Sequence, residues 1–336
     1  MKMLKYLAKR ILIFIPLFVG VVFVAFYLVR LLPGDPAHIL AGSYAFEDTI
    51  EALTKQMGLD KPVFTQFLIY MKGVLHGDLG YSWFTSSSVT QDILTRFPAT
   101  FELITLSILM ALVIGMAIGI GSAVNPKGIF SKISSIYGLL AGSFADFWLA
   151  LLFIYLFFAV LGIAPAPMGR LNIILSPPKR ITGMYVFDSL VTGNWVVFKD
   201  ALAHLALPVI TIGLIQGAAV MKMTNSTMVE IMESDFIHHA KIMGLPTSMI
   251  VRYALRNSLS AIVATVGNIY TFLLGGAVLI ETVFSLGGLG QYVTQALSNK
   301  DYQAIQGFIL VATVFSMVLY LVIDIIQMII DPRIKY

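Results

Sequence analysis

Four carboxylates lie inside or at the ends of long apolar stretches: Glu102, Asp146, Glu281 and Asp324. A charged side chain at the centre of a membrane helix costs about 2.5–3.5 kcal/mol, so it must face water, a cation or a polar partner. Each of these residues is therefore a candidate for one of three places: a water-filled path through a membrane, a structural pair between helices, or a solvated helix end.

Asp146 lies deepest, near the middle of the apolar run 133–161, and aromatic side chains flank it at Phe144, Phe147 and Trp148. Two interpretations stay open for its carboxylate, because it can line a water-filled path or pair with a cation on a neighbouring helix. If Asp146 lines a water-filled path, Phe147 and Trp148 would line the same path.

The other three carboxylates lie near the ends of apolar runs. Glu102 begins a run and Glu281 follows one, so a solvated helix end fits both. Glu281 is also kept with Asp146, Phe147 and Trp148 as a candidate for the path. Asp324, in the last third of the final run, better fits a pair with a neighbouring helix.

The sequence lacks the motifs of the enzyme classes considered. It has no GxxxxGK[ST] phosphate loop, and its glycine cluster SLGGLGQ has no lysine. HExxH, GxSxG and cysteine are absent, and the adjacent His238 and His239 would point about 100° apart on a helix. These observations predict a non-catalytic chain that binds no metal or cofactor itself. A membrane enzyme stays as the disfavoured alternative.

Composition places the chain in a membrane. Hydrophobic residues make up 58% of the 336 residues and charged residues 12%, and the mean hydropathy is +0.88. A soluble domain carries roughly 25% charged residues. The net charge of +4 does not indicate nucleic-acid binding, because the basic residues lie mostly beside apolar runs.

Six apolar runs are long enough to cross a bilayer core, which needs about 20 helical residues. They are 11–32, 101–124, 133–161, 204–221, 259–279 and 305–330. The sequence therefore predicts an all-α integral membrane protein with six transmembrane helices. Internal glycines favour close packing between these helices. They include Gly115, Gly119, Gly213, Gly275 and Gly276.

Lysine and arginine are denser on one side of the predicted spans, including Lys2, Lys127, Arg252, Arg333 and Lys335. The positive-inside rule then predicts that both termini are cytoplasmic. The predicted segments are a cytoplasmic N-terminus at 1–10, an extracytoplasmic segment with two short helices at 33–98, and a transmembrane domain at 99–336. The last contains an extracytoplasmic loop at 162–203 and a cytoplasmic loop at 222–257.

Within that cytoplasmic loop, residues 230–257 are polar but keep apolar residues at helical spacing. Phe236, Ala240 and Met243 predict an amphipathic helix, and Pro246 predicts that this helix ends or bends there. Such a helix either lies on the membrane surface or docks against a soluble partner.

Eight strings, in this order, resemble the B-type permease subunit of the dipeptide/oligopeptide/nickel class of ABC importers over essentially the whole chain. They are LLPGDP (31–36), MGLDKP (57–62), GDLGYSW (77–83), FPATFEL (97–103), HLALPVITIG (204–213), ALRNSL (254–259), ETVFSLGGLG (281–290) and DPRI (331–334). The resemblance implies the type I ABC importer permease fold in a bacterial inner membrane.

The cytoplasmic loop resembles that family's EAA loop. The resemblance implies a short coupling helix seated in a groove of a cytoplasmic ATPase, with Asp235 and Phe236 as the acidic-aromatic pair. The implied coupling residues are Asp235, Phe236, His239, Ala240, Gly244 and Leu245. His238 and His239 depart from the family pattern, which usually has basic and small residues there.

The resemblance also implies function and partners. A homologous second permease would complete a heterodimeric path, two ATPase subunits would bind ATP and Mg²⁺, and an extracytoplasmic binding protein would deliver cargo. The chain itself would contact peptide and membrane lipid, but no nucleic acid. The long outer segment 177–204 resembles dipeptide-type members.

One departure from the family bears on the cargo. Ala145 stands where the family commonly has proline in S-x-P-x-F-W, and Asp146 follows it. Nickel chelates or another small solute are therefore the alternative cargo. The histidines that a metal cargo would need all lie outside the centres of the predicted spans. They are His38, His76, His204, His238 and His239. A standalone channel or secondary transporter is a further alternative.

Overall fold

The structure is a computed structural model that describes residues 2–31, 37, 41, 46–56 and 58–330. Several features of the sequence lie outside these residues: most of LLPGDP, His38, Met57, and the C-terminal string DPRI with its neighbour Lys335. The described residues are mostly helical, as predicted, and the rest form loops and one two-stranded hairpin. They fall into two compact units.

Unit 1 comprises the described residues of 1–98 and 288–318. Its elements are α1 (Lys2–Arg30), α3 (Glu47–Gln56), α4 (Val63–Leu75), β1 (Tyr81–Ser82), β2 (Ser87–Ser88), α13 (Leu289–Ser298) and the first parts of α5 (Val89–Val124) and α14 (Tyr302–Ile330). Strands β1 and β2 are antiparallel, with Tyr81 opposite Ser88. The two short helices predicted around GLDKP are confirmed as α3 and α4.

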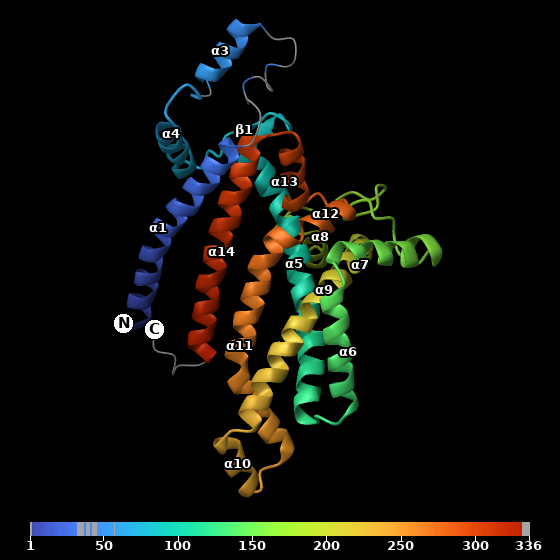
Figure 1. The fold of residues 1–336 in the computed structure, drawn as a ribbon. Coiled ribbons are helices and arrows are strands. Elements are labelled where there is room, and N and C mark those ends of the chain that lie inside the picture. The colour runs from blue at the N-terminus through green and yellow to red at the C-terminus, as the bar shows by residue number, and fades with distance from the viewer. Residues whose placement is uncertain (1, 32–36, 38–40, 42–45, 57, 331–336) are drawn as a thin grey trace. The chain divides into compact units, whose positions relative to one another are not determined.

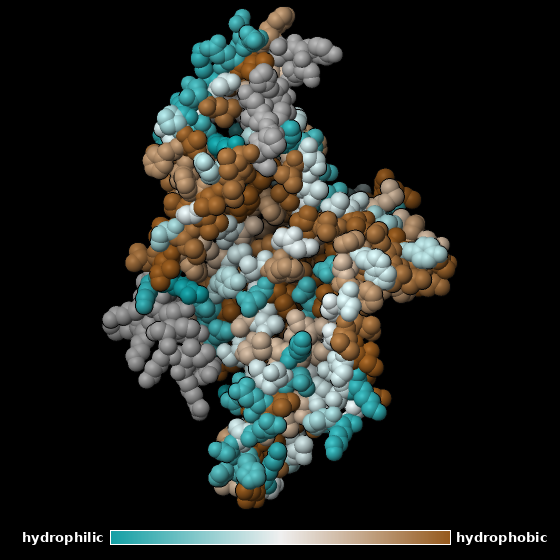
Figure 2. All heavy atoms as spheres, viewed as in Figure 1, coloured by the Kyte–Doolittle hydropathy of each residue, from teal (hydrophilic) through white to brown (hydrophobic). Residues whose placement is uncertain are grey.

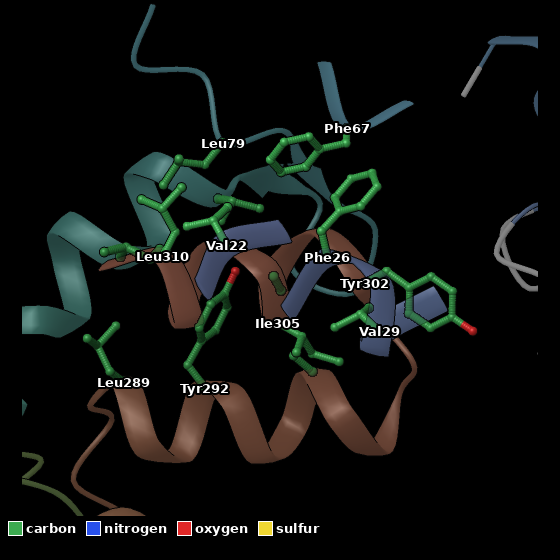
Figure 3. Close-up of a cluster of buried hydrophobic side chains, with 14 residues drawn as sticks. Val22, Phe26, Val29, Phe67, Leu79, Leu289, Tyr292, Tyr302, Ile305 and Leu310 are labelled. Atoms are coloured by element: carbon green, nitrogen blue, oxygen red, sulfur yellow. The ribbon is translucent and has the colours of Figure 1, made fainter. Parts of the chain in front are cut away.

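An apolar core holds unit 1 together (Figure 3). Phe26 of α1 and Phe67 of α4 pack edge to face with ring centroids 5.4 Å apart. Tyr292 of α13 and Ile305 of α14 belong to the same buried cluster. Segments far apart in the sequence therefore share one core.

Unit 2 comprises residues 99–287 and the described residues of 319–336 (Figure 1). It contains the rest of α5 and α14, together with α6 (Ile129–Ser143), α7 (Asp146–Phe153), the π-helix η1 (Ile154–Val160), α8 (Tyr185–Val191), α9 (Trp195–Met232), α10 (Asp235–Ile242), α11 (Thr247–Gly276) and α12 (Val278–Val283). Helices α9 and α11 form its most extensive helix pair.

Two glycines of α5 allow α9 to pack closely, as the sequence predicts. A Cβ at Gly115 would lie 2.7 Å from the carbonyl oxygen of Gly217, and one at Gly119 would lie 2.8 Å from Cβ of Thr224. Gly275 does not fit this expectation, because a Cβ there would have no neighbour within 4 Å.

Among the described residues, five helices are long and apolar enough to cross a membrane, or six if one bent pair counts as a single span. The prediction of one continuous helix over 133–161 is wrong. Helices α6 and α7 meet at an angle of 100°. Phe144 and Ala145 between them are extended, with ψ of 137° and 140°. Ser143 Oγ donates to the carbonyl of Leu139 in the last turn of α6, a bond that often bends helices.

The fourth span is also longer than predicted. Helix α9 covers 38 residues, whereas the sequence predicted a span over 204–221. His204 is buried inside α9 rather than at its start. Its Nδ1 lies 2.9 Å from the carbonyl oxygen of Asp200, so the side chain is accommodated within its own helix.

Candidate functional site

Helix α10 is a short helix between α9 and α11. Asp235 stands in its first turn, where a carboxylate is favourable near the helix N-terminus. The helix ends at Ile242, and Pro246 directly precedes α11, so the predicted end near Pro246 is confirmed. The apolar spacing of the sequence thus produces a discrete helix.

Gly244 closes α10 in a left-handed conformation with φ of +73°. The Gly244 N–H donates to the carbonyl of Lys241 at 3.0 Å, and the Leu245 N–H donates to that of Ala240 at 3.2 Å. These two bonds form a Schellman motif, which favours glycine because other residues are strained at positive φ. The backbone at this end of α10 therefore depends on Gly244.

The apolar residues of α10 and its C-terminal end divide into two groups. Ile237 is fully buried and Ala240 is 7% exposed, so they anchor the helix to its own unit. Phe236 is 57% exposed and Met243 80% exposed. The expected single face of Phe236, Ala240 and Met243 is thus wrong, because Ala240 faces inward.

The exposed apolar side chains lie among polar ones. Figure 2 shows hydrophilic side chains over the end of unit 2 that carries α10. Ile242 is 72% exposed, and the Phe236 ring lies 6.1 Å from that of Tyr253 on α11. His239 is exposed, and its Nδ1 lies 2.9 Å from the carbonyl oxygen of Asp235. Clustered apolar residues with a polar rim are typical of a docking site.

Asp146 is the first residue of α7, directly after the bend. Its side chain is half-buried, and it forms no ion pair with any other residue that the structure describes. The rings of Phe144 and Trp148 stack across the bend, with centroids 4.9 Å apart and planes within 7°. Phe147 and Trp148 are 44% and 45% exposed. The bend therefore presents one carboxylate beside accessible aromatic rings, a combination suited to a cationic amine.

Glu102 is buried, so its expected place at a solvated helix end is wrong. Its carboxylate accepts hydrogen bonds from the backbone N–H groups of Tyr185 (3.0 Å), Val186 (2.7 Å) and Phe187 (3.3 Å). These are the first N–H groups of α8, which lack partners within the helix. Glu102 thus acts as a cap that α5 supplies to α8.

Arg170 completes this cluster from the loop before α8. Its Nη1 donates to the carbonyl of Gly183 at 3.2 Å, and its guanidinium lies 3.9 Å from the centroid of Tyr185. Burial lowers the pKa of Arg170, against the opposing effects of Tyr185, Glu102 and Glu281. The two buried carboxylates therefore help to keep this buried cation charged.

Glu281 is also buried, at 1% exposed, and not at a solvated helix end. Its Oε1 accepts a 2.5 Å hydrogen bond from Oγ1 of Thr100. The sequence did not single out Arg170 or Thr100. The strings FPATFEL and ETVFSLGGLG were the available signal, since they contain Thr100, Glu102 and Glu281.

Asp188 of α8 fixes the loop that precedes it. Its carboxylate accepts hydrogen bonds from the N–H groups of Ile181, Thr182 and Gly183 and from Oγ1 of Thr182 at 2.7 Å. Burial alone would raise the pKa of Asp188, but these bonds outweigh it and hold the pKa below its usual range. The loop before α8 is thus tied to α8 by a charged carboxylate.

Asp324 is buried at 8% exposed in α14. Within the described ranges, no group of three or more histidine, aspartate or glutamate side chains could hold a metal ion.

Comparisons with known proteins match nearly the whole chain to permeases of one transport family. Residues 112–336 match the family described as binding-protein-dependent transport system inner membrane component, and residues 3–104 match its membrane component N-terminal family. A dipeptide transport system permease protein, DppB, of Alkalihalophilus pseudofirmus is 37% identical over 99% of the chain and 100% of the relative. The probable D,D-dipeptide permease DdpB of Escherichia coli is 39% identical over 94% and 93%. A glutathione transport system permease protein, GsiC, of Pectobacterium atrosepticum is 33% identical over 99% and 100%.

Proposed function

Since the chain belongs to the family of binding-protein-dependent transport system inner membrane components, we propose that it forms half of the path by which an ATP-driven importer carries short peptides across the bacterial inner membrane. The full-length likeness to dipeptide permeases supports peptide cargo. The apolar helices and the family support a multi-pass permease that is not itself an enzyme.

The proposed assembly supplies what this chain lacks. A homologous second permease would form the other half of the path, and an extracytoplasmic binding protein would deliver cargo. Two cytoplasmic ATPase subunits would bind ATP and Mg²⁺, because the sequence has no phosphate-binding loop. The density of lysine and arginine supports cytoplasmic termini and a cytoplasmic α10.

The exposed apolar end of α10 is the observation that carries the coupling proposal. Phe236, Ile242 and Met243 would enter a groove of the ATPase, while buried Ile237 and Ala240 transmit its movement to the long helices α9 and α11. Asp235, His239, Gly244 and Leu245 would shape the same contact. Closure of the ATPase pair on ATP would then tilt the helices between inward-open and outward-open states.

At the bend, Asp146 with Phe147 and Trp148 would face the cargo path. A carboxylate beside accessible rings suits the ammonium group of a peptide N-terminus, through charge and cation–π attraction. Glu281 has a different setting, because its carboxylate is buried and hydrogen-bonded to Thr100. That setting supports a role in positioning the outer segments in the conformation observed.

The coupling proposal is tested by ATP-dependent peptide uptake into vesicles that contain the complete importer. Gly244→Arg places a bulky charge at the end of α10, where a Cβ has no neighbour within 4 Å, so we expect loss of uptake with normal membrane insertion. Gly193→Arg is the matched control, because Gly193 has φ of +69° and similar open space in the loop between α8 and α9. Normal uptake by Gly244→Arg would contradict the proposal.

A further inference from the structure

Unit 1 contains a partly polar pocket of about 200 Å³, formed by α1, α4 and α14 with the segments on either side of α4. Phe26 and Tyr302, labelled in Figure 3, line it from α1 and α14. Nothing in the proposed transport cycle uses this pocket. Its chemistry is set by Arg30, Tyr70, Asp78 and Gln306.

Arg30 is held rigidly at this pocket. Its Nε donates to Oε1 of Gln66 at 2.8 Å, and its guanidinium carbon lies 3.4 Å from the centroid of the Phe26 ring. Gln66 is itself fixed, because its Nε2 donates to the carbonyl of Lys61 at 2.8 Å. Among the described residues, Nη2 of Arg30 has no hydrogen-bond acceptor. The fixed guanidinium of Arg30 therefore has hydrogen-bond donors that a ligand in the pocket could use.

Two further donors of the pocket lack acceptors within the described part of the chain. They are the buried hydroxyl of Tyr70 and the buried Nε2 of Gln306, a residue that is only 6% exposed. Burial raises the pKa of Tyr70, against the opposing effect of Arg30, so the hydroxyl keeps its proton. Buried donors without acceptors destabilise a fold, and their gathering in one pocket indicates an acceptor from outside the described residues.

The position of the pocket indicates what that acceptor is. Arg30 is the last residue of the membrane span Lys9–Arg30, where lipid headgroups meet water. An apolar groove of about 720 Å³ runs along the same helix from Pro16 to Val29 and ends one residue before Arg30. An acyl chain in that groove would place its own phosphate near the guanidinium.

We infer that this pocket binds the phosphate of a phospholipid whose headgroup also carries an ammonium group, as in phosphatidylethanolamine. Arg30, Tyr70 and Gln306 would donate to the phosphate oxygens, since guanidinium groups match phosphate geometry. Asp78 also lines the pocket and is exposed, so its carboxylate suits the ammonium group. The groove favours a phospholipid over free phosphate.

The test is lipid binding to the full-length chain purified in detergent with the subunits that co-purify. Quantitative lipid analysis and titration with phosphatidylethanolamine should show stoichiometric binding. Gln306→Leu should weaken it about tenfold, the usual effect of losing a hydrogen bond to a charged group. Because Leu also removes a buried unsatisfied group, the delipidated variant should unfold at the same or a higher temperature. A merely structural role for Gln306 would lower that temperature and would overturn the inference.

Gln327→Leu is the matched control, because Gln327 lies on the same helix outside the pocket and donates to the carbonyl of Ser260. It should leave phosphatidylethanolamine binding unchanged. Asp78→Asn should shift the preference from phosphatidylethanolamine toward phosphatidylglycerol, which lacks the ammonium group. Equal lipid retention by the native chain and Gln306→Leu would overturn the inference. So would binding of inorganic phosphate without retained phospholipid.

Discussion

Arg170 and Glu102 meet 68 residues apart in the chain, with Nη1 of Arg170 3.9 Å from Oε2 of Glu102. The side chains are only 10% and 3% exposed, respectively. The same carboxylate caps α8, so one buried charge joins the long helix α5 to the loop before α8 and to α8 itself. A buried pair of this kind is costly to break, because either partner alone is an uncompensated charge.

Glu102→Gln keeps the shape of the side chain but removes the charge that faces Arg170. We expect a loss of roughly 3–5 kcal/mol in the free energy of unfolding, measured by denaturant titration in detergent micelles. Glu51→Gln is the control, because Glu51 pairs with Lys55 at the surface and exposed pairs contribute little. Adding Arg170→Met to Glu102→Gln should recover part of the loss. If Glu102→Gln were as stable as the native chain, the buried pair would contribute nothing to the free energy of unfolding.

Asp188 predicts a dependence of stability on pH. Its folded pKa is depressed by the hydrogen bonds from residues 181–183, so its contribution is complete above the unfolded value of about 4. The contribution disappears as pH falls below that value through the folded pKa. Thermal unfolding of the native chain and Asp188→Asn should therefore differ by a constant amount above about pH 5, and the difference should shrink below about pH 4. A difference that is independent of pH would contradict this assignment.

The apolar membrane spans could be predicted from hydropathy, because apolar length is a local property of the sequence. The bend before Asp146 could not, since the run 133–161 is apolar enough over its whole length to be one span and contains no proline. It is formed by two extended residues, Phe144 and Ala145, and Phe144 stacks on Trp148 four residues later. A family proline at the position of Ala145 would have indicated the break.

The site was harder to predict, because part of it is assembled from residues that are far apart in the sequence. The end of α10 follows from Gly244 and Pro246, which are local signals. The buried cluster joins Glu102, Arg170 and Glu281 from three distant segments, and no spacing in the sequence connects them. Periodicity also could not decide that Ala240 faces inward and Phe236 outward, because both fit one stripe of a helix.

Helices α5 and α9 are so close at Gly115 that we expect them not to tolerate even one added methyl group between them. A Cβ there would meet Gly217 O and Val220 Cβ at 2.7 Å, so Gly115→Ala should lower stability by roughly 1–3 kcal/mol. Gly142→Ala in α6 has nothing within 4 Å and should be neutral or stabilise its helix by up to about 1 kcal/mol. Thermal unfolding in detergent distinguishes the two substitutions by the sign of the shift. A stabilising Gly115→Ala would show that the helices can separate without cost.

Asp146→Asn tests the proposed contact with the peptide N-terminus. Loss of the carboxylate should raise KM for uptake of a free dipeptide about tenfold, the usual effect of losing a charged hydrogen bond. The same dipeptide with an acetylated N-terminus lacks the ammonium group, so the substitution should leave its uptake unchanged. Equal effects on the free and the acetylated dipeptide would exclude this contact.

Phe236 is exposed and its neighbour Ile237 is buried on α10. Substituting each in turn therefore distinguishes an effect on docking from an effect on folding. Ile237 is fully buried, so Ile237→Ala should destabilise the local fold by roughly 2–5 kcal/mol and increase hydrogen exchange in residues 235–242. Phe236→Ala removes an exposed ring, so hydrogen exchange should stay normal while peptide-stimulated ATP hydrolysis and uptake both fall. Leu139→Ala is a control for Phe236→Ala, because Leu139 is 73% exposed on α6 and its loss should affect neither. Normal uptake with Phe236→Ala would mean that the exposed ring takes no part in coupling.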